Sequence, residues 1–153
     1  MPKAEPRARS VTELEPLYTA EEMKAAEAGH DVEALMERAG SAVAAAVARD
    51  YPGARVVAVC GKGANGGDGR IAAQKLGAEV VEVGAELPPA DVVIDAIFGT
   101  GFHGEPREEA ARSIEAIRNA NVPVVAVDVP SGVNASTGEV GRASCRERVS
   151  FLV

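Results

Sequence analysis

Four short valine-rich runs recur through the last two thirds of the chain, and they constrain its fold more than any other feature. We expect each run to form a strand, at residues 55–60, 79–83, 91–97 and 122–127. Apolar residues at helical spacing predict intervening helices over 71–76 and through Ala110–Ile117. Alternation of this kind is typical of a mostly parallel sheet covered on both faces, so the predicted fold class is α/β, a three-layer α/β/α arrangement.

The chain before the first strand is predicted to be helical. Residues 1–16 hold three prolines and scattered charge, which indicates a flexible leader. Thr19 and Glu22 have the spacing of a capping box, so a short helix should follow and end near Gly29. Apolar residues at helical spacing predict a longer amphipathic helix over 32–48.

Composition excludes several classes of protein. Sixteen basic and 23 acidic side chains give a net charge of −7, which argues against nucleic acid as a partner. The longest apolar runs, 42–48 and 122–127, are far shorter than the roughly 20 residues of a membrane span. No secretory signal precedes them, so we expect a cytoplasmic location and no membrane partner. Cys60 and Cys145 cannot form a disulfide framework, and Cys60 is expected to be buried.

A glycine-rich segment follows the first predicted strand. Gly61, Gly63 and Gly66 fit G-x-G-x-x-G, and Glu82 follows 21 residues after Gly61. This pattern is typical of a Rossmann-like dinucleotide loop, in which backbone amides hold a pyrophosphate and the acid binds a ribose. Asn65 and Asp68 weaken that interpretation, because side-chain oxygens do not suit a pyrophosphate. A glycine turn without a ligand is the alternative.

The third predicted strand carries Asp95 within an otherwise apolar run, and a buried carboxylate needs a partner or a cation. Glycines at 99, 101 and 104 follow it and permit close approach of the backbone to a ligand. Phe98 and Phe102 would either wall a ring-shaped ligand or pack beneath the loop. We expect His103 to be a solvated loop residue rather than an acid–base group.

The fourth predicted strand ends at Asp128, and Ser131 lies three residues further on. Two aspartates at adjoining strand ends beside a glycine loop favour a functional site. Asn65, Asp95 and Ser131 carry hard oxygen donors. With backbone carbonyls they could hold K⁺, Na⁺ or Mg²⁺, or they could satisfy one another by hydrogen bonds.

Three strings in this order resemble the YjeF N-terminal domain family, the NAD(P)H-hydrate epimerases. They are GKGANGGDG at 61–69, IDAIFGTGF at 94–102 and VDVPSG at 127–132. The segments LYTAEEMKAAE at 17–27 and LMERAG at 35–40 are similar to the opening helices of the family. The resemblance extends over residues 17–140, which we interpret as an incomplete epimerase domain.

The resemblance implies the interconversion of the R and S forms of NADHX and NADPHX, which are hydrated nicotinamide cofactors. It makes Asn65, Asp95 and Ser131 ligands of one K⁺ per subunit, and Asp128 the acid–base group. Its substrate contacts would be Ala64, Asn65, Gly66, Gly67, Asp68, Gly99, Thr100, Gly101, Phe102, His103, Gly104, Glu105 and Asp128. Ala64 stands where the family usually has Asn. A homodimer and a fused or separate ADP- or ATP-dependent NAD(P)HX dehydratase are further implications.

The resemblance ends at Val140. Residues 141–153 look like the translation of a sequencing adapter, and we interpret them as a non-native tail. The C-terminal strands of the sheet would then be missing. So would the lysine that the family pairs with its catalytic aspartate, which puts the activity of this polypeptide in doubt. Two alternatives are an ordinary Rossmann NAD(P)-dependent dehydrogenase, which rests on the glycine loop and Glu82, and a non-catalytic nucleotide-binding or scaffold module.

Overall fold

A parallel β-sheet forms the centre of the molecule. The structure, a computed structural model, describes residues 18–144 and 149–151. Its strands are β1 (Val56–Cys60), β2 (Glu79–Glu82), β3 (Val92–Ala96), β4 (Val124–Ala126) and β5 (Val149–Phe151). They form one five-stranded sheet in the order β2-β1-β3-β4-β5, and every neighbouring pair is parallel. The predicted α/β class is therefore confirmed.

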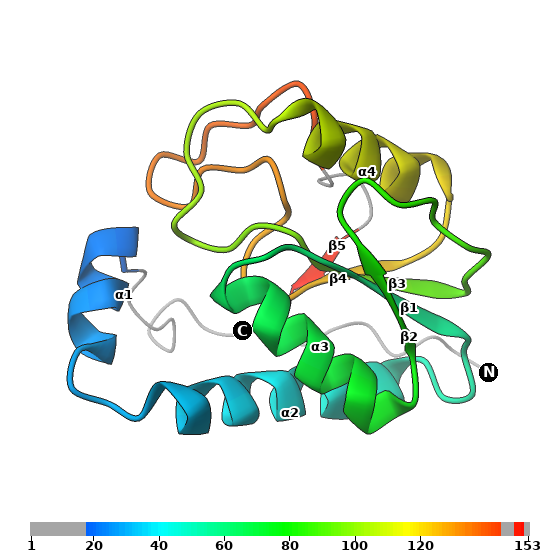
Figure 1. Ribbon diagram of the computed structural model, residues 1–153, viewed down its shortest axis with the longest axis horizontal. Coiled ribbons are helices and arrows are strands. Elements are labelled where there is room, and N and C mark those ends of the chain that lie inside the picture. Colours follow the sequence, from blue (N-terminus) through cyan, green and yellow to red (C-terminus); the bar gives the residue numbers. More distant parts are fainter. Residues whose placement is uncertain (1–17, 145–148, 152–153) are drawn as a thin grey trace, which may run out of the picture.

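Helices cover both faces of the sheet (Figure 1). The helices are α1 (Ala20–Glu27), α2 (Val32–Asp50), α3 (Ala64–Leu76) and α4 (Glu108–Asn119), of which α1 stands apart from the sheet. Figure 1 shows α2 and α3 on one face and α4 on the other. The arrangement is the predicted Rossmann-like α/β/α sandwich.

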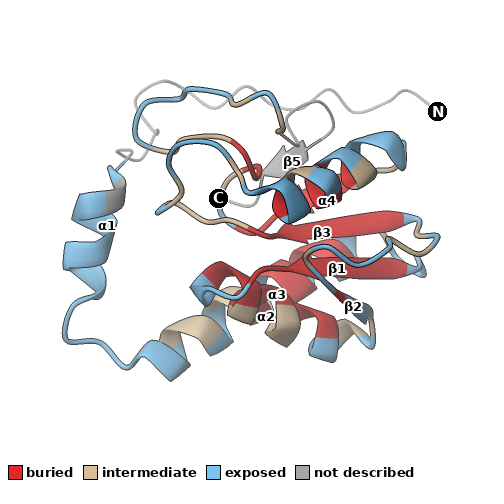
Figure 2. Ribbon diagram, turned by 45° about the horizontal axis from the view of Figure 1, so that its top comes forward, coloured by how far each residue is buried: buried red, intermediate tan, exposed pale blue. Residues whose placement is uncertain are grey.

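Alternating strand residues supply the two halves of the core. In β1, Val56, Ala58 and Cys60 pack with residues of α2 and α3, whereas Val57 and Val59 pack with residues of α4. Both faces of β1 and β3 are consequently buried (Figure 2). Burial also raises the pKa of the Cys60 thiol to about 11, so this cysteine is a packing residue, as predicted.

The two N-terminal helices begin where the sequence predicts. The backbone N–H of Glu22 donates to Thr19 Oγ1 over 3.3 Å, and the Thr19 N–H donates to Glu22 Oε2 over 2.7 Å, which completes the capping box. Asp31 caps α2 through the backbone N–H groups of Glu33 and Ala34. Figure 2 shows α1 exposed along its length.

The third helix differs from the prediction, because it begins at Ala64 and not at residue 71. The glycines that suggested a loop are instead positions of close packing. A Cβ at Gly66 would collide with the carbonyl oxygen of Gly61, and one at Gly69 would collide with Ala96. Tertiary contact thus overrides the poor helix propensity of glycine. As a result, Asn65 and Asp68 lie in the first two turns of a helix rather than in a loop.

The C-terminal part of the sheet also differs. β4 is limited to three residues, Val124–Ala126, within the predicted 122–127. β5 was not predicted at all, and it adds a parallel strand in which Val149 is the partner of Val124. This strand lies within the segment interpreted as a non-native tail, whose origin stays a prediction. The proposed leader, residues 1–16, lies outside the described residues.

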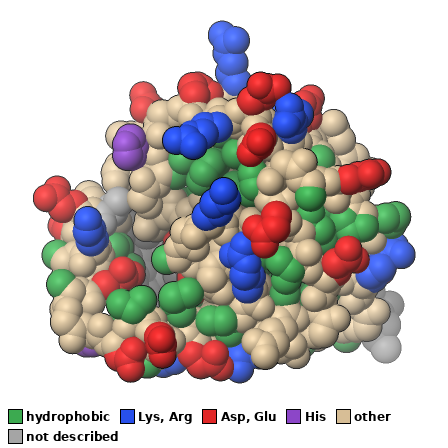
Figure 3. Space-filling model, viewed as in Figure 1, with side chains coloured by type: hydrophobic (Ala, Val, Ile, Leu, Met, Phe, Trp, Pro, Cys, Tyr) green, Lys and Arg blue, Asp and Glu red, His purple; other side chains and the backbone are tan. Residues whose placement is uncertain are grey.

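Acidic and basic side chains are interspersed over the face seen in Figure 3. This mixture fits a chain whose 16 basic and 23 acidic residues are spread along its length. Within residues 18–144 and 149–151, no helix combines the length and apolar character needed to cross a membrane.

The packing of α3 on the sheet gives a first prediction. Gly69→Ala should lower the free energy of unfolding by about 1–2 kcal/mol, because overpacking costs about 1–3 kcal/mol and outweighs the gain of up to about 1 kcal/mol in helix propensity. Besides Ala96, the new methyl group would meet Cys60 Sγ at 3.0 Å. Gly101→Ala is the control, since nothing lies within 4 Å of a Cβ there. Urea unfolding measures both, and equal stabilities would contradict this packing.

Candidate active site at the carboxyl ends of the strands

The strand order places a topological switch point between β1 and β3, the position at which parallel α/β sheets generally have a crevice. The chain passes from β1 into α3 on one face of the sheet and from β3 towards α4 on the other. At such a switch point the two connections diverge, and ligands of parallel α/β sheets bind in the space between them. The three predicted strings all end in this region, after β1, β3 and β4.

Asp95 is the most buried charged residue of the site. It lies in β3 with no exposed surface. Ser131 satisfies both carboxylate oxygens, because its N–H donates to Oδ2 over 2.8 Å and its hydroxyl donates to Oδ1 over 2.6 Å. The N–H of Ile97 adds a 3.3 Å hydrogen bond to Oδ1. Asp95 thereby ties the end of β3 to the loop that follows β4.

Ser131 extends this connection, since its Oγ also accepts a 3.0 Å hydrogen bond from the N–H of Phe98. Ser131 is fully buried, and its neighbours Pro130 and Gly132 are buried too. Gly132 has a φ of +90°, and a Cβ there would collide with the carbonyl oxygen of Ala143. A glycine is therefore required next to Ser131.

Asn65 brings the first turn of α3 to the same place. Its Nδ2 donates to the carbonyl oxygen of Phe98 over 2.9 Å. Among the described residues, its buried Oδ1 has no hydrogen-bond partner. A buried amide oxygen without a donor is costly, so it calls for a cation or a water molecule.

The donor set suits a hard cation. Asn65 Oδ1, the Asp95 carboxylate and Ser131 Oγ are all oxygen atoms, and Phe98 joins them through its backbone. The described residues contain no group of three or more His, Cys, Asp or Glu side chains able to hold a metal ion. Because this donor set contains only one carboxylate, that of Asp95, it suits an ion of low charge better than a transition metal.

Two further carboxylates face the crevice. Burial, together with the negative charges of Asp128 and Glu27, raises the pKa of Asp68 to about 6. Loss of solvation also raises the pKa of Asp128, although this side chain keeps exposed surface. A hydrogen bond from the backbone N–H of Thr100 lowers the pKa of Asp128, whereas the negative charge of Glu27 raises it.

Glu27 is a site residue that the sequence analysis missed. It is the last residue of α1, and its charge acts on both Asp68 and Asp128. Nothing in the local pattern distinguishes it from Glu21 and Glu22 in the same helix. Only its place within the segment 17–27, which resembles the family, could have indicated it.

The loop after β3 passes close to these groups. A Cβ at Gly99 would lie 2.6 Å from Asp128 Oδ2 and 3.2 Å from Asn65 Cβ, so a larger residue there would require the Asp128 side chain to move. The rings of Phe98 and Phe102 stack on each other, with centroids 4.3 Å apart. Phe98 packs against the core as well, which agrees with the packing alternative for these rings.

The predicted substrate contacts therefore fall into two groups. Asn65, Asp68, Gly99, Thr100 and Asp128 converge on the crevice. The rest of the predicted loop contacts are mostly exposed, and His103 has Nδ1 3.1 Å from the carbonyl oxygen of Gly101. Exposed or intermediate are Ala64, Gly67, Gly101, Phe102, His103, Gly104 and Glu105, whereas Gly66 is buried.

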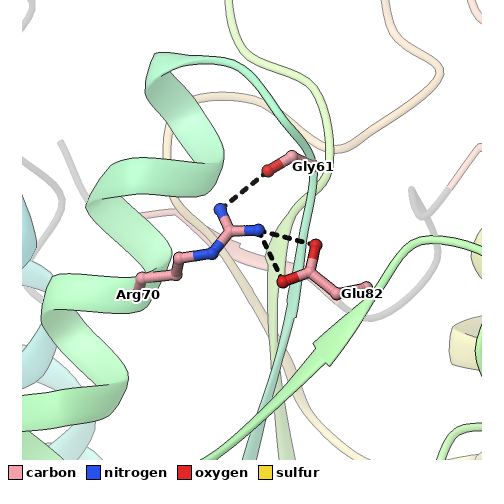
Figure 4. Close-up of polar contacts among 3 residues, drawn as sticks. All are labelled: Gly61, Arg70 and Glu82. Atoms are coloured by element: carbon pink, nitrogen blue, oxygen red, sulfur yellow. Dashed lines mark hydrogen bonds and ion pairs between the residues drawn. The ribbon is translucent and has the colours of Figure 1, made fainter.

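Glu82 does not occupy the role that a dinucleotide fingerprint gives it. Both of its carboxylate oxygens accept hydrogen bonds from Arg70 Nη2, over 2.7 and 2.6 Å (Figure 4). Glu82 thus has a partner within the chain, so its presence after β2 is explained without a ribose hydroxyl. This weakens the ordinary dehydrogenase alternative.

The fold and site define a Rossmann-like α/β domain with an oxygen-rich crevice at its switch point. The chain belongs to the family described as "YjeF-related protein N-terminus", whose sequence model matches residues 32–88 and 77–153.

Curated relatives are similar over most of the chain. A bifunctional NAD(P)H-hydrate repair enzyme Nnr from Pyrobaculum aerophilum is 39% identical over 147 residues, which cover 69% of this chain and 29% of the relative. An NAD(P)H-hydrate epimerase from Plasmodium vivax is 34% identical, with coverage of 80% and 54%. One from Limosilactobacillus fermentum is 37% identical, with coverage of 69% and 67%. The chain thus spans 29% and 54% of the length of the first two relatives.

The raised pKa of Asp68 gives a second prediction. The pKa is about 6 in the folded chain and 3.8 as the ordinary value, so the folded state holds the extra proton between these limits. Stability gained by that proton is full below about pH 4 and lost as the pH rises through about 6. Asp68→Asn removes this loss. The free energy of unfolding of the variant, relative to that of the parent, should therefore rise by roughly 1–2 kcal/mol between pH 4 and pH 7.5. This is less than the full pKa shift would give, because solvent screens the charge. Urea unfolding at both pH values measures it, and a constant difference would refute it.

Proposed function

We propose that this chain is an NAD(P)H-hydrate epimerase, which interconverts the R and S forms of NADHX and NADPHX. The observation that carries the proposal is the convergence of Asp128 with Asp68, Gly99 and Asn65 at the switch point. Two of the relatives are NAD(P)H-hydrate epimerases, which supports the same activity. Carboxylates with raised pKa values are more frequent at catalytic sites than elsewhere, which favours the enzyme over a non-catalytic module.

Asp128 is the acid–base residue in this proposal. Inversion at the hydroxyl-bearing ring carbon requires a proton to be delivered and removed next to the ring. A carboxyl group can both accept and donate a proton, and loss of solvation raises the pKa of Asp128 above its ordinary value, which favours the protonated form. Gly99 leaves Oδ2 accessible, because any side chain there would meet that oxygen.

Asn65, Asp95 and Ser131 would hold one K⁺ ion per subunit. The unpartnered Oδ1 of Asn65 is the feature that fits such an ion. When bound, the ion supplies positive charge that orients an anionic nucleotide and favours the ionised form of nearby carboxylates. The exposed stretch from Gly99 to Glu105, and the first turn of α3 from Ala64 to Asp68, would contact the nucleotide. Backbone N–H groups at this helix N-terminus suit its phosphates.

The proposal includes three broader points. Because one relative is described as a bifunctional repair enzyme, we infer that this domain works with an ADP- or ATP-dependent dehydratase, fused or separate. We also propose a homodimer, as the family resemblance implies. A cytoplasmic location follows from the proposed substrates, which arise from the nicotinamide cofactors of metabolism.

Substitution of Asp128 tests the proposed chemistry. Asp128→Asn should lower kcat for NADHX epimerisation by at least about 100-fold, since general acid–base catalysis contributes about 10²–10⁴-fold. Asp91→Asn is the matched control, because Asp91 precedes β3 at the opposite end of the sheet, where it accepts from the Arg55 N–H. Chromatographic separation of the two epimers measures the rate. An Asp128→Asn variant as active as the control would remove Asp128 from the reaction.

Potassium dependence tests the proposed ion site. About 100 mM KCl should raise the Tm by about 3–6 °C over the same concentration of choline chloride, if the ion binds with a Kd near 10 mM. Asn65→Ala should abolish this difference. Asn134→Ala should retain it, because the Asn134 side chain accepts hydrogen bonds from the backbone N–H groups of Ser136 and Thr137, within its own turn. The same Tm shift in the parent and Asn65→Ala would exclude Asn65 as a ligand.

A further inference from the structure

Arg70 joins two segments that follow neighbouring strands (Figure 4). From the second turn of α3, its Nη1 donates to the carbonyl oxygen of Gly61 over 2.8 Å. Its Nη2 donates to both carboxylate oxygens of Glu82, over 2.7 and 2.6 Å. Gly61 directly follows β1, and Glu82 is the last residue of β2. The guanidinium group therefore connects the entrance of α3 to the edge strand of the sheet.

Gly61 is the junction on which this contact acts. Its N–H donates to the carbonyl oxygen of Ala96 over 2.9 Å, and a Cβ at Gly61 would collide with the carbonyl oxygen of Ile97. On the other side, Gly66 packs directly onto the Gly61 carbonyl oxygen. The direction of that carbonyl group consequently sets how closely the first turn of α3 approaches the loop after β3.

Asn65 precedes Gly66 in this turn, and its amide spans the same gap to the Phe98 carbonyl oxygen. A displacement of the turn would move Asn65 Oδ1 relative to Asp95 and Ser131, which are fixed by their own hydrogen bonds. It would also move Asp68 relative to Asp128.

The Arg70–Glu82 ion pair contributes little to the stability of the fold. The Arg70 and Glu82 side chains are 37% and 59% exposed, and exposed pairs add little to the free energy of folding. A guanidinium group held at two oxygens of one carboxylate has a fixed direction, however, and it can impose that direction on a third acceptor. The geometry thus favours a positional role.

We propose that Arg70 is a positioning residue of the epimerase site, which orients the Gly61 carbonyl group so that the first turn of α3 presents Asn65 and Asp68 to the substrate and the ion. Glu82 fixes the guanidinium group in this role. The inference rests on the proposed function. It adds Arg70 and Glu82 as residues that support the site without touching the reacting atoms.

The test compares Arg70→Met, Arg70→Lys and the exchange Arg70→Glu with Glu82→Arg in the full chain. Arg70→Met should lower kcat/KM about tenfold and weaken activation by KCl, because small displacements of binding groups have large effects on rate. Arg70→Lys should lie between Met and the parent, since one ammonium group can reach the Gly61 carbonyl oxygen. The exchange should not restore activity, because it keeps opposite charges but loses the contact with Gly61.

Arg112→Met is the matched control, since Arg112 forms an exposed 2.8 Å ion pair with Glu108 within α4, on the face of the sheet opposite α3. It should retain the kcat/KM and KCl activation of the parent. Restoration of activity by the charge exchange would show that the ion pair alone matters and would overturn the positioning role. Equal values for Arg70→Met and Arg112→Met would overturn it as well.

A readout without substrate separates this inference from the proposed function. If the parent chain does not epimerise NADHX, the proposed function fails and the epimerase role of Arg70 fails with it. If the parent is active, the Tm difference between KCl and choline chloride gives a second decision. The difference should shrink in Arg70→Met and persist in Arg112→Met, and an unchanged difference would contradict the proposed link between Arg70 and Asn65.

Discussion

The buried contact between Asp95 and Ser131 is the interaction on which the rest of the site depends. It places a carboxylate in the middle of an apolar strand, where it would be costly without its hydrogen bonds. These hydrogen bonds join the loops after β3 and β4, and Ser131 Oγ also accepts a hydrogen bond from the Phe98 N–H. The carbonyl oxygen of Phe98 in turn accepts a hydrogen bond from the Asn65 side chain of α3. One buried carboxylate thus organises three segments that are distant in sequence.

Glycines set the distances within this arrangement. At Gly66 and Gly69 they allow α3 to lie directly on the sheet, and at Gly99 they allow the loop after β3 to pass beside Asp128. The same close packing reduces the solvation of Asp68 and Asp128 and raises the pKa values of both. Packing and electrostatics at the site therefore have a common cause.

Much of this arrangement follows from the sequence. Valine-rich runs predicted the first four strands, and they correctly predicted that Asp95 and Asp128 lie at the ends of the neighbouring strands β3 and β4. The predicted start of α3 was wrong, because glycine has a low helix propensity. Only the tertiary contacts reveal why glycines are needed in its first turns. Glu27 and Arg70 were missed because charged residues on a helix look alike in sequence. The boundaries of the domain, including the origin of residues 141–153, stay predictions.

The most direct test of the account starts from each pure epimer of NADHX in turn. An epimerase changes the rate of interconversion but not its equilibrium, so the purified chain should bring R-NADHX and S-NADHX to the same final ratio, faster than in buffer alone. Chromatography over time would follow both forms. Conversion at the rate of the protein-free sample from either side would contradict the account.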